Sequence, residues 1–193
     1  SHYFRQNFSQ VTNPPIDSLR ENKVMSLKTR FGNLGNILDF DNLTEENIYV
    51  LDSPILTNSQ FKKFKRFFSK KTKIIDCTFD ISSSLKERIE SIREEAETSV
   101  REGSTCLILS DKDITNQKAS IPSILTVGAV HSHLIKHGLR GYCSLNVECS
   151  DALDTHSFAV LIGVGATTVN PYLAIDSIYQ RFEKKLFGKS DFE

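Results

Sequence analysis

Residues 82–109, SSSLKERIESIREEAETSVREGSTCLIL, decide which fold class this chain adopts. The first part predicts a helix over 82–103, because apolar side chains recur on one face while Glu and Arg fill the other. That face comprises Leu85, Ile89, Ile92, Ala96 and Val100. Gly103 suits the end of the helix, and the apolar run 105–109 that follows is typical of a buried strand. A long helix that leads directly into a buried strand indicates an α/β protein.

The same alternation of strands and helices recurs on both sides of this stretch. We expect further strands at 47–51, 73–79 and 142–148 and near 168–171, with helices at 57–68, 121–138, 155–163 and 172–187. Another helix is expected after Asp17, with Val24, Leu27 and Phe31 on one face. Strands joined by helices run parallel, because each helix makes the return trip. The prediction is therefore an α/β fold of parallel βα units, either barrel-like or an open sheet.

The composition limits the class of partner. The chain has 193 residues with 24 basic and 24 acidic side chains, so we expect one domain with no overall field for nucleic acid or a membrane surface. No apolar run approaches the roughly 20 residues that cross a bilayer, and the first residues form no basic leader. A soluble, cytoplasmic protein is expected. The run KKFKRFFSKKTK at 62–73 carries Phe64, Phe67 and Phe68, which favours a basic helix with a buried aromatic face over a nucleic-acid site.

Polar residues gather where the predicted strands end. They are Asp52, Ser53, Thr78, Ser110, Asp111, Glu148, Ser150 and Asn170. The carboxyl ends of parallel strands are where α/β proteins bind small molecules, so these residues are candidates for a ligand pocket. The same residue types also cap helices and satisfy loop backbone, and residue type alone favours that structural role.

Histidine and cysteine give no metal prediction. His131, His133 and His137 include a pair one helical turn apart, but no acidic residue or third ligand has metal-site spacing, so packing or surface roles are expected. The four cysteines lie far apart without a C-x-x-C pair, which predicts buried, reduced thiols. They are Cys77, Cys106, Cys143 and Cys149.

Three blocks resemble the central domain of the glutamate synthase large subunit. They are QVTNPPIDSLRE at 10–21, IPSILTVGAVHSHLIKHGLR at 121–140 and HSFAVLIGVGATTVNPYLAI at 156–175. The resemblance implies a relative of the (β/α) FMN-binding barrel that follows this domain in the family. It also implies that the chain is the C-terminal greater part of that domain, with a leading segment at 1–16, βα units at 17–188 and a tail at 189–193.

The resemblance implies a structural and coupling role. In the family, this domain links a glutaminase domain to an FMN domain and contributes to the tunnel that carries ammonia between them. The matching tunnel residues are Thr12, Asn13 and Pro14, where two prolines stiffen a polar turn. No catalytic residue is expected, and these residues alone are expected to be inactive.

The cofactors implied by the resemblance belong to the parent enzyme rather than to this chain. They are FMN, an iron–sulfur cluster, and NAD(P)H or ferredoxin as the electron donor. The partners are the glutaminase and FMN domains of the same polypeptide, and self-association is possible through exposed apolar surface. The alternative is a stand-alone α/β protein or enzyme that binds a small molecule at the strand ends.

Overall fold

The computed structural model describes residues 19–21, 25–31, 38 and 48–186. The chain divides into two compact units, 1–54 and 55–193. In the first, strands β1 (Thr29–Phe31) and β2 (Tyr49–Leu51) form an antiparallel ribbon that pairs Arg30 with Val50. The prediction of a helix that includes Leu27 and Phe31 is therefore wrong, because Phe31 lies in a strand. The strand expected at 47–51 is present, but it belongs to this ribbon and not to the parallel sheet.

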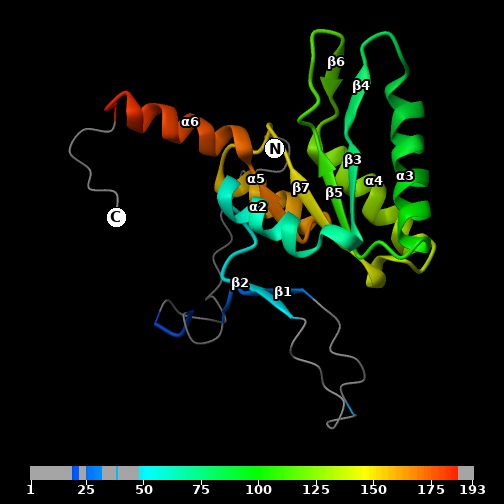
Figure 1. Ribbon diagram of the computed structural model, residues 1–193, viewed down its shortest axis with the longest axis horizontal. Helices are drawn as coiled ribbons and strands as arrows, with labels where there is room; N and C mark the ends of the chain where they lie inside the picture. Colours follow the sequence, from blue (N-terminus) through cyan, green and yellow to red (C-terminus); the bar gives the residue numbers. More distant parts are fainter. Residues whose placement is uncertain (1–18, 22–24, 32–37, 39–47, 187–193) are drawn as a thin grey trace, which may run out of the picture. The chain divides into compact units, whose positions relative to one another are not determined.

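The second unit is built on a parallel sheet of four strands in the order β3-β5-β7-β8 (Figure 1). The strands are β3 (Thr72–Asp76), β5 (Cys106–Ser110), β7 (Ser144–Glu148) and β8 (Thr168–Asn170). Order in the sheet follows order in the chain, as in a (β/α) barrel, but the sheet stays open. The predicted α/β class of parallel βα units is confirmed in its open-sheet form. Among the described residues, one parallel bridge between Ile55 and Val169 extends the sheet beyond β8.

Three connecting helices cover one face of this sheet. They are α3 (Leu85–Arg101), α4 (Ser123–Lys136) and α5 (Thr155–Gly163). Each joins neighbouring parallel strands, and right-handed crossovers of that kind place successive helices on the same side. The alternate strand residues Leu107, Leu109 and Val147 point into the core beneath them and are almost completely buried.

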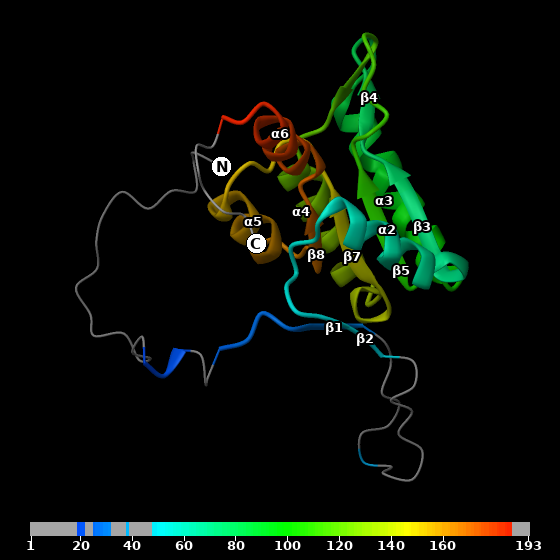
Figure 2. The ribbon, with the colours of Figure 1, turned by 60° about the vertical axis from the view of Figure 1, so that its left-hand side comes forward.

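Helix α2 (Asn58–Phe67) lies on the opposite side of the sheet (Figures 1 and 2). Thr57 begins it with a capping box: its hydroxyl oxygen accepts from Gln60 N, and Gln60 Oε1 accepts from Thr57 N. Phe61 and Phe64 are fully buried. Phe67, expected on the buried aromatic face, is instead 52% exposed, so the basic run forms an amphipathic helix with a narrower apolar face than predicted.

A two-stranded arm extends from the end of β3. Strands β4 (Thr78–Asp80) and β6 (Lys118–Ser120) pair antiparallel, so the strand predicted at 73–79 divides at Cys77. The backbone of Cys77 makes two hydrogen bonds: its N–H donates to the carbonyl oxygen of Ser110, and its carbonyl oxygen accepts from Ile121 N. Arg88 of α3 supports the bend by donating to the carbonyl oxygens of Asp76 and Thr78.

The remaining elements follow the predicted order with shifted ends. Short 3₁₀ turns occupy Ser69–Lys71 and Arg140–Tyr142, and the last helix, α6, runs Tyr172–Glu183. Helix α4 starts after Pro122, where the carboxylate of Asp151 accepts from the backbone N and the Oγ of Ser123. In the described ranges, no helix is both long enough and apolar enough to cross a membrane.

Candidate functional site

A buried carboxylate, Glu148, lies at the carboxyl end of β7. It is 3% exposed, and Lys65 of α2 and Lys112 after β5 contact its Oε1 at 3.1 and 2.8 Å. Ser110 donates from Oγ to Oε2 at 3.0 Å. Burial opposes ionisation, but the hydrogen bonds and charges of Lys112 and Lys65 outweigh it and hold the pKa of Glu148 below its usual value. Glu148 is thus a charged anchor between α2, β5 and β7.

A second carboxylate, Asp111, lies beside it. Its Oδ2 accepts from the backbone N and the Oγ of Ser150, at 2.9 and 2.6 Å, while its buried Oδ1 has no hydrogen-bond partner. Burial, the negative charge of Asp111 and a side-chain hydrogen bond to Asp111 raise the pKa of Tyr172 to about 12. The ammonium of Lys112 lies 4.9 Å from the centre of the Tyr172 ring. Lys112 therefore connects the Glu148 and Asp111 groups.

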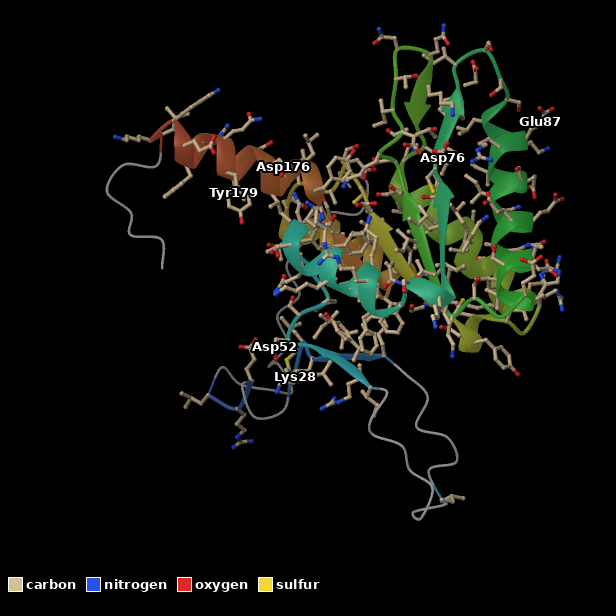
Figure 3. The ribbon with its side chains drawn as sticks, in the orientation of Figure 1. Lys28, Asp52, Asp76, Glu87, Asp176 and Tyr179 are labelled. Atoms are coloured by element: carbon tan, nitrogen blue, oxygen red, sulfur yellow. The ribbon has the colours of Figure 1, made fainter. Side chains whose placement is uncertain are left out.

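Asn170 closes the edge at the end of β8. Its amide donates to the carbonyl oxygen of Leu56 and to Asn58 Oδ1, both at 2.9 Å. Asn58 in turn donates to Asp176 Oδ1 at 2.7 Å, and Figure 3 shows Asp176 on α6. This chain of amides joins the start of α2 to β8 and α6.

The structure sorts the strand-end candidates into separate groups. It brings Ser110 together with Glu148, and Asp111 together with Ser150. Thr78 instead begins β4 and donates to Asp76, and Asn170 bonds to the α2 side. Asp52 and Ser53 belong to the first unit. The tunnel residues Thr12, Asn13 and Pro14 lie outside the described residues.

Sequence reasoning missed the cations and the phenol of this edge. Lys65 belongs to the run predicted to form a basic helix, and its position one turn after the buried Phe61 indicates that its stem is covered. Lys112 directly follows a strand-end aspartate, and Tyr172 follows Pro171 at the start of α6. Their partners became visible only after α2 and β7 were placed in space.

The opposite, amino end of the sheet is organised by Arg140. Its guanidinium donates to the carbonyl oxygens of Cys143 and Gly165, at 2.6 and 2.9 Å, and its Nε donates to His131 Nδ1 at 3.1 Å. Gly165 has φ +123°, and a Cβ built there would overlap the His131 imidazole. Burial and the charge of Arg140 lower the pKa of His131. These residues form a structural joint before β7 and β8.

The other two histidines have an acidic partner that the sequence did not reveal. His133 Nε2 lies 2.7 Å from Glu97 Oε2 of α3, and His137 follows four residues later as the C-cap of α4. Glu97 comes from a different helix, so the spacing of the histidines does not reveal it.

The thiols do not suit an iron–sulfur cluster. All four cysteines are free and buried, which confirms the prediction of reduced thiols. Burial raises the pKa of each, to about 12 for Cys77, whereas cluster ligands are thiolates. Among the described residues, the one His/Cys/Asp/Glu group with metal-ligand proximity contains no cysteine. In the part of the chain that the structure describes, these cysteines therefore offer no ligand set for the iron–sulfur cluster expected of a parent enzyme.

The open parallel sheet and the paired charges at its carboxyl end define the class of protein as an open, parallel α/β domain. The glutamate synthase central domain family matches residues 1–192. The chain belongs to this family, as the three sequence blocks indicated.

Three relatives of the chain are glutamate synthases. The chain is 52% identical to the glutamate synthase [NADPH] large chain of Azospirillum brasilense, over its full length and 13% of that protein. It is 40% identical to the chloroplastic ferredoxin-dependent glutamate synthase of Spinacia oleracea, over 92% of the chain and 11% of that protein. It is also 40% identical to the glutamate synthase [NADPH] large chain of Bacillus subtilis, over 95% of the chain and 12% of that protein. The chain thus corresponds to a small part of each relative.

Proposed function

We propose that this chain is a structural and coupling domain of a glutamate synthase. It links the glutaminase domain to the FMN domain and contributes to the ammonia tunnel while glutamate forms from glutamine and 2-oxoglutarate. The observation that carries the proposal is the family match over residues 1–192, supported by relatives that are all much longer than this chain.

The physical state of the polar edge supports a coupling role over a catalytic one. Glu148 already interacts with Lys65, Lys112 and Ser110, so neither the carboxylate nor the lysines are poised to exchange a proton with a substrate. The thiols are held protonated by burial, which disfavours a cysteine nucleophile. We therefore propose that chemistry takes place in the neighbouring domains, which bind the FMN and the iron–sulfur cluster.

The tunnel proposal rests on Thr12, Asn13 and Pro14. Ammonia passes as a neutral molecule, so a stiff passage with hydrogen-bonding groups and no carboxylate would carry it without trapping ammonium. Two consecutive prolines at 14 and 15 fix their own φ angles and restrict Asn13, which supplies that stiffness.

The test uses the full-length glutamate synthase that contains this domain. In Asn13→Ala and Pro14→Gly variants, glutamine hydrolysis should continue while glutamate formation falls, so that ammonia appears in solution. Asn116→Ala is the matched control, because Asn116 is an exposed loop residue remote in sequence from the turn. If both variants keep the wild-type ratio of hydrolysis to glutamate formation, the tunnel role is wrong.

The electron donor and the compartment are also proposed from the relatives. Relatives are named for NADPH, NADH or ferredoxin, so the parent of this chain is proposed to use one of these donors. We propose the cytoplasm as the location, with a plastid as the alternative because the Spinacia relative is chloroplastic.

The alternative function is a stand-alone small-molecule site at the strand ends. The unpartnered, buried Oδ1 of Asp111 is the observation that favours it, because such an atom would gain from a ligand donor. A thermal shift experiment with glutamine, whose amide and ammonium groups carry N–H donors, distinguishes the two functions. Stabilisation that is lost in Asp111→Asn supports the alternative, and an unchanged melting temperature argues against it.

A further inference from the structure

Helices α3 and α4 bring a carboxylate and two imidazoles together on the outside of the second unit. Each of Glu97, His133 and His137 offers one ligand atom, and these atoms all lie within 4.8 Å of one another. Glu97 comes from α3, while His133 lies in the last turn of α4 and His137, four residues later, is the C-cap of that helix. We propose that these three side chains form a binding site for a divalent transition-metal ion of the zinc type.

The residue types fit such an ion. Zn²⁺ prefers imidazole nitrogen and carboxylate oxygen at about 2.0 to 2.2 Å, and sites with three protein ligands leave a fourth position for water. Ligand atoms of a tetrahedral site with those bond lengths lie about 3.3 Å apart, so side-chain rotation is enough to adapt the present arrangement. The side chains of Glu97, His133 and His137 are 22, 19 and 34% exposed, which leaves the group accessible to ions in solution.

Neighbouring groups orient the ligands. Arg101 donates from Nε and NH2 to Glu97 Oε1, at 2.9 and 2.7 Å, which directs Oε2 toward His133. The Nδ1 of His137 lies 2.9 Å from the carbonyl oxygen of His133, to which it donates, and 3.8 Å from Glu97 Oε2. The neutral ring keeps its lone pair on Nε2, so His137 would bind the ion through Nε2. Both contacts are of the kind that hold metal ligands in a fixed orientation.

The site exchanges one interaction for another when the ion binds. His133 Nε2 and Glu97 Oε2 lie 2.7 Å apart and share a hydrogen atom, because a carboxylate accepts and the imidazole donates. The ion takes the place of that hydrogen on Nε2: a neutral ring then carries its hydrogen on Nδ1, and an imidazolium ring releases its extra proton to solvent. The bound ion would connect two helices whose ligands are 36 residues apart in the chain and would stabilise their packing.

The first experiment is isothermal titration calorimetry of the 193-residue chain with Zn²⁺ and, separately, with Mg²⁺. One Zn²⁺ should bind per chain, and Mg²⁺ should not, because Mg²⁺ prefers oxygen ligands. Glu97→Gln, His133→Asn and His137→Asn should each weaken Zn²⁺ binding by more than Arg101→Ala, for which about a tenfold loss is expected. The matched control is Glu94→Gln, an exposed glutamate on the same helix, which should bind as the wild type does.

A second experiment covers the outcome in which a ligand variant fails to fold. Circular dichroism identifies such a variant. The variant His137→Cys then tests the site through a new absorption band, so the test does not depend on a loss of binding. With Co²⁺ it should show a thiolate-to-cobalt charge-transfer band that the wild type lacks, since the native cysteines are buried. Equal Zn²⁺ affinity in all the folded variants, no Zn²⁺ binding by the wild type, or no new band in His137→Cys would each overturn the proposal.

Discussion

The two ends of the parallel sheet hold charged side chains in opposite ways. At the carboxyl end, the negative charge of Glu148 is neutralised by the positive charges of Lys65 and Lys112. At the amino end, the Arg140 guanidinium is held by the backbone carbonyls of Cys143 and Gly165. The first arrangement depends on protonation state and the second on backbone shape. Perturbing charge should therefore weaken one end, and perturbing backbone conformation should weaken the other.

The largest effect is expected from Gly165→Ala at the amino end. The positive φ costs a non-glycine residue about 1–3 kcal/mol, and the overlap with His131 adds about 1–3 kcal/mol, so the free energy of unfolding should fall by about 4 kcal/mol. Urea denaturation of the purified chain measures this loss. Gly128→Ala is the matched control, because a Cβ there meets nothing within 4 Å. In α4 it should stabilise by about 0.5–1 kcal/mol, and an equal loss in both variants would contradict the role of backbone shape.

A smaller effect, about 2 kcal/mol, is expected from Glu148→Gln at the carboxyl end, because the amide keeps the Ser110 contact but leaves two lysines without their counter-charge. The pKa of Glu148 is lower in the folded chain than its ordinary 4.5, so its charge stabilises the fold above pH 4.5. That contribution is lost as the pH falls through the folded pKa. The slope of stability against pH below 4.5 should therefore be shallower in Glu148→Gln than in the wild type.

This pH experiment also separates the two ends of the sheet. Gly165→Ala should lower the whole stability curve without changing its slope below pH 4.5, because Glu148 remains in place. Parallel wild-type and Glu148→Gln curves in that range would show that the ion pairs contribute nothing to the acid response.

The smallest effects are expected from the lysines. Lys65 and Lys112 are 27 and 46% exposed, so solvent screens both, and Lys112 more strongly. Lys65→Met should cost about 1 kcal/mol and Lys112→Met about 0.5 kcal/mol, because the remaining lysine still neutralises Glu148. Thermal denaturation at low and high salt measures both. A greater loss of stability from Lys112→Met than from Lys65→Met would contradict the expectation that the more buried lysine contributes more.

The parallel core was predictable from the sequence because its signals are local. The apolar face of α3 has helical periodicity, and the strand at Cys106–Ser110 is a continuous apolar run. Gly103 and Gly138, expected to end helices, have φ of +98° and +70°. These features need no knowledge of distant residues.

The remaining features depend on contacts between distant residues. Leu27 and Phe31 match a helical period, yet Thr29–Phe31 pairs with Tyr49–Leu51, and no local pattern announces that partner. The sequence does not show that α2 crosses the sheet and brings Lys65 to Glu148. It also does not show that α3 lies against α4 and brings Glu97 to His133. Sequence reasoning therefore identified the strand-end positions but not which cations neutralise them.

The four cysteines are all buried and free, and burial raises the pKa of each. Reagents that alkylate sulfur react with exposed thiolates, so the native conformation protects these positions. Modification then proceeds only from locally opened conformations, at a rate set by how often each segment opens. The cysteines thus report separately on local opening of the arm at Cys77, of the amino end of β5 at Cys106, and of the two ends of β7 at Cys143 and Cys149.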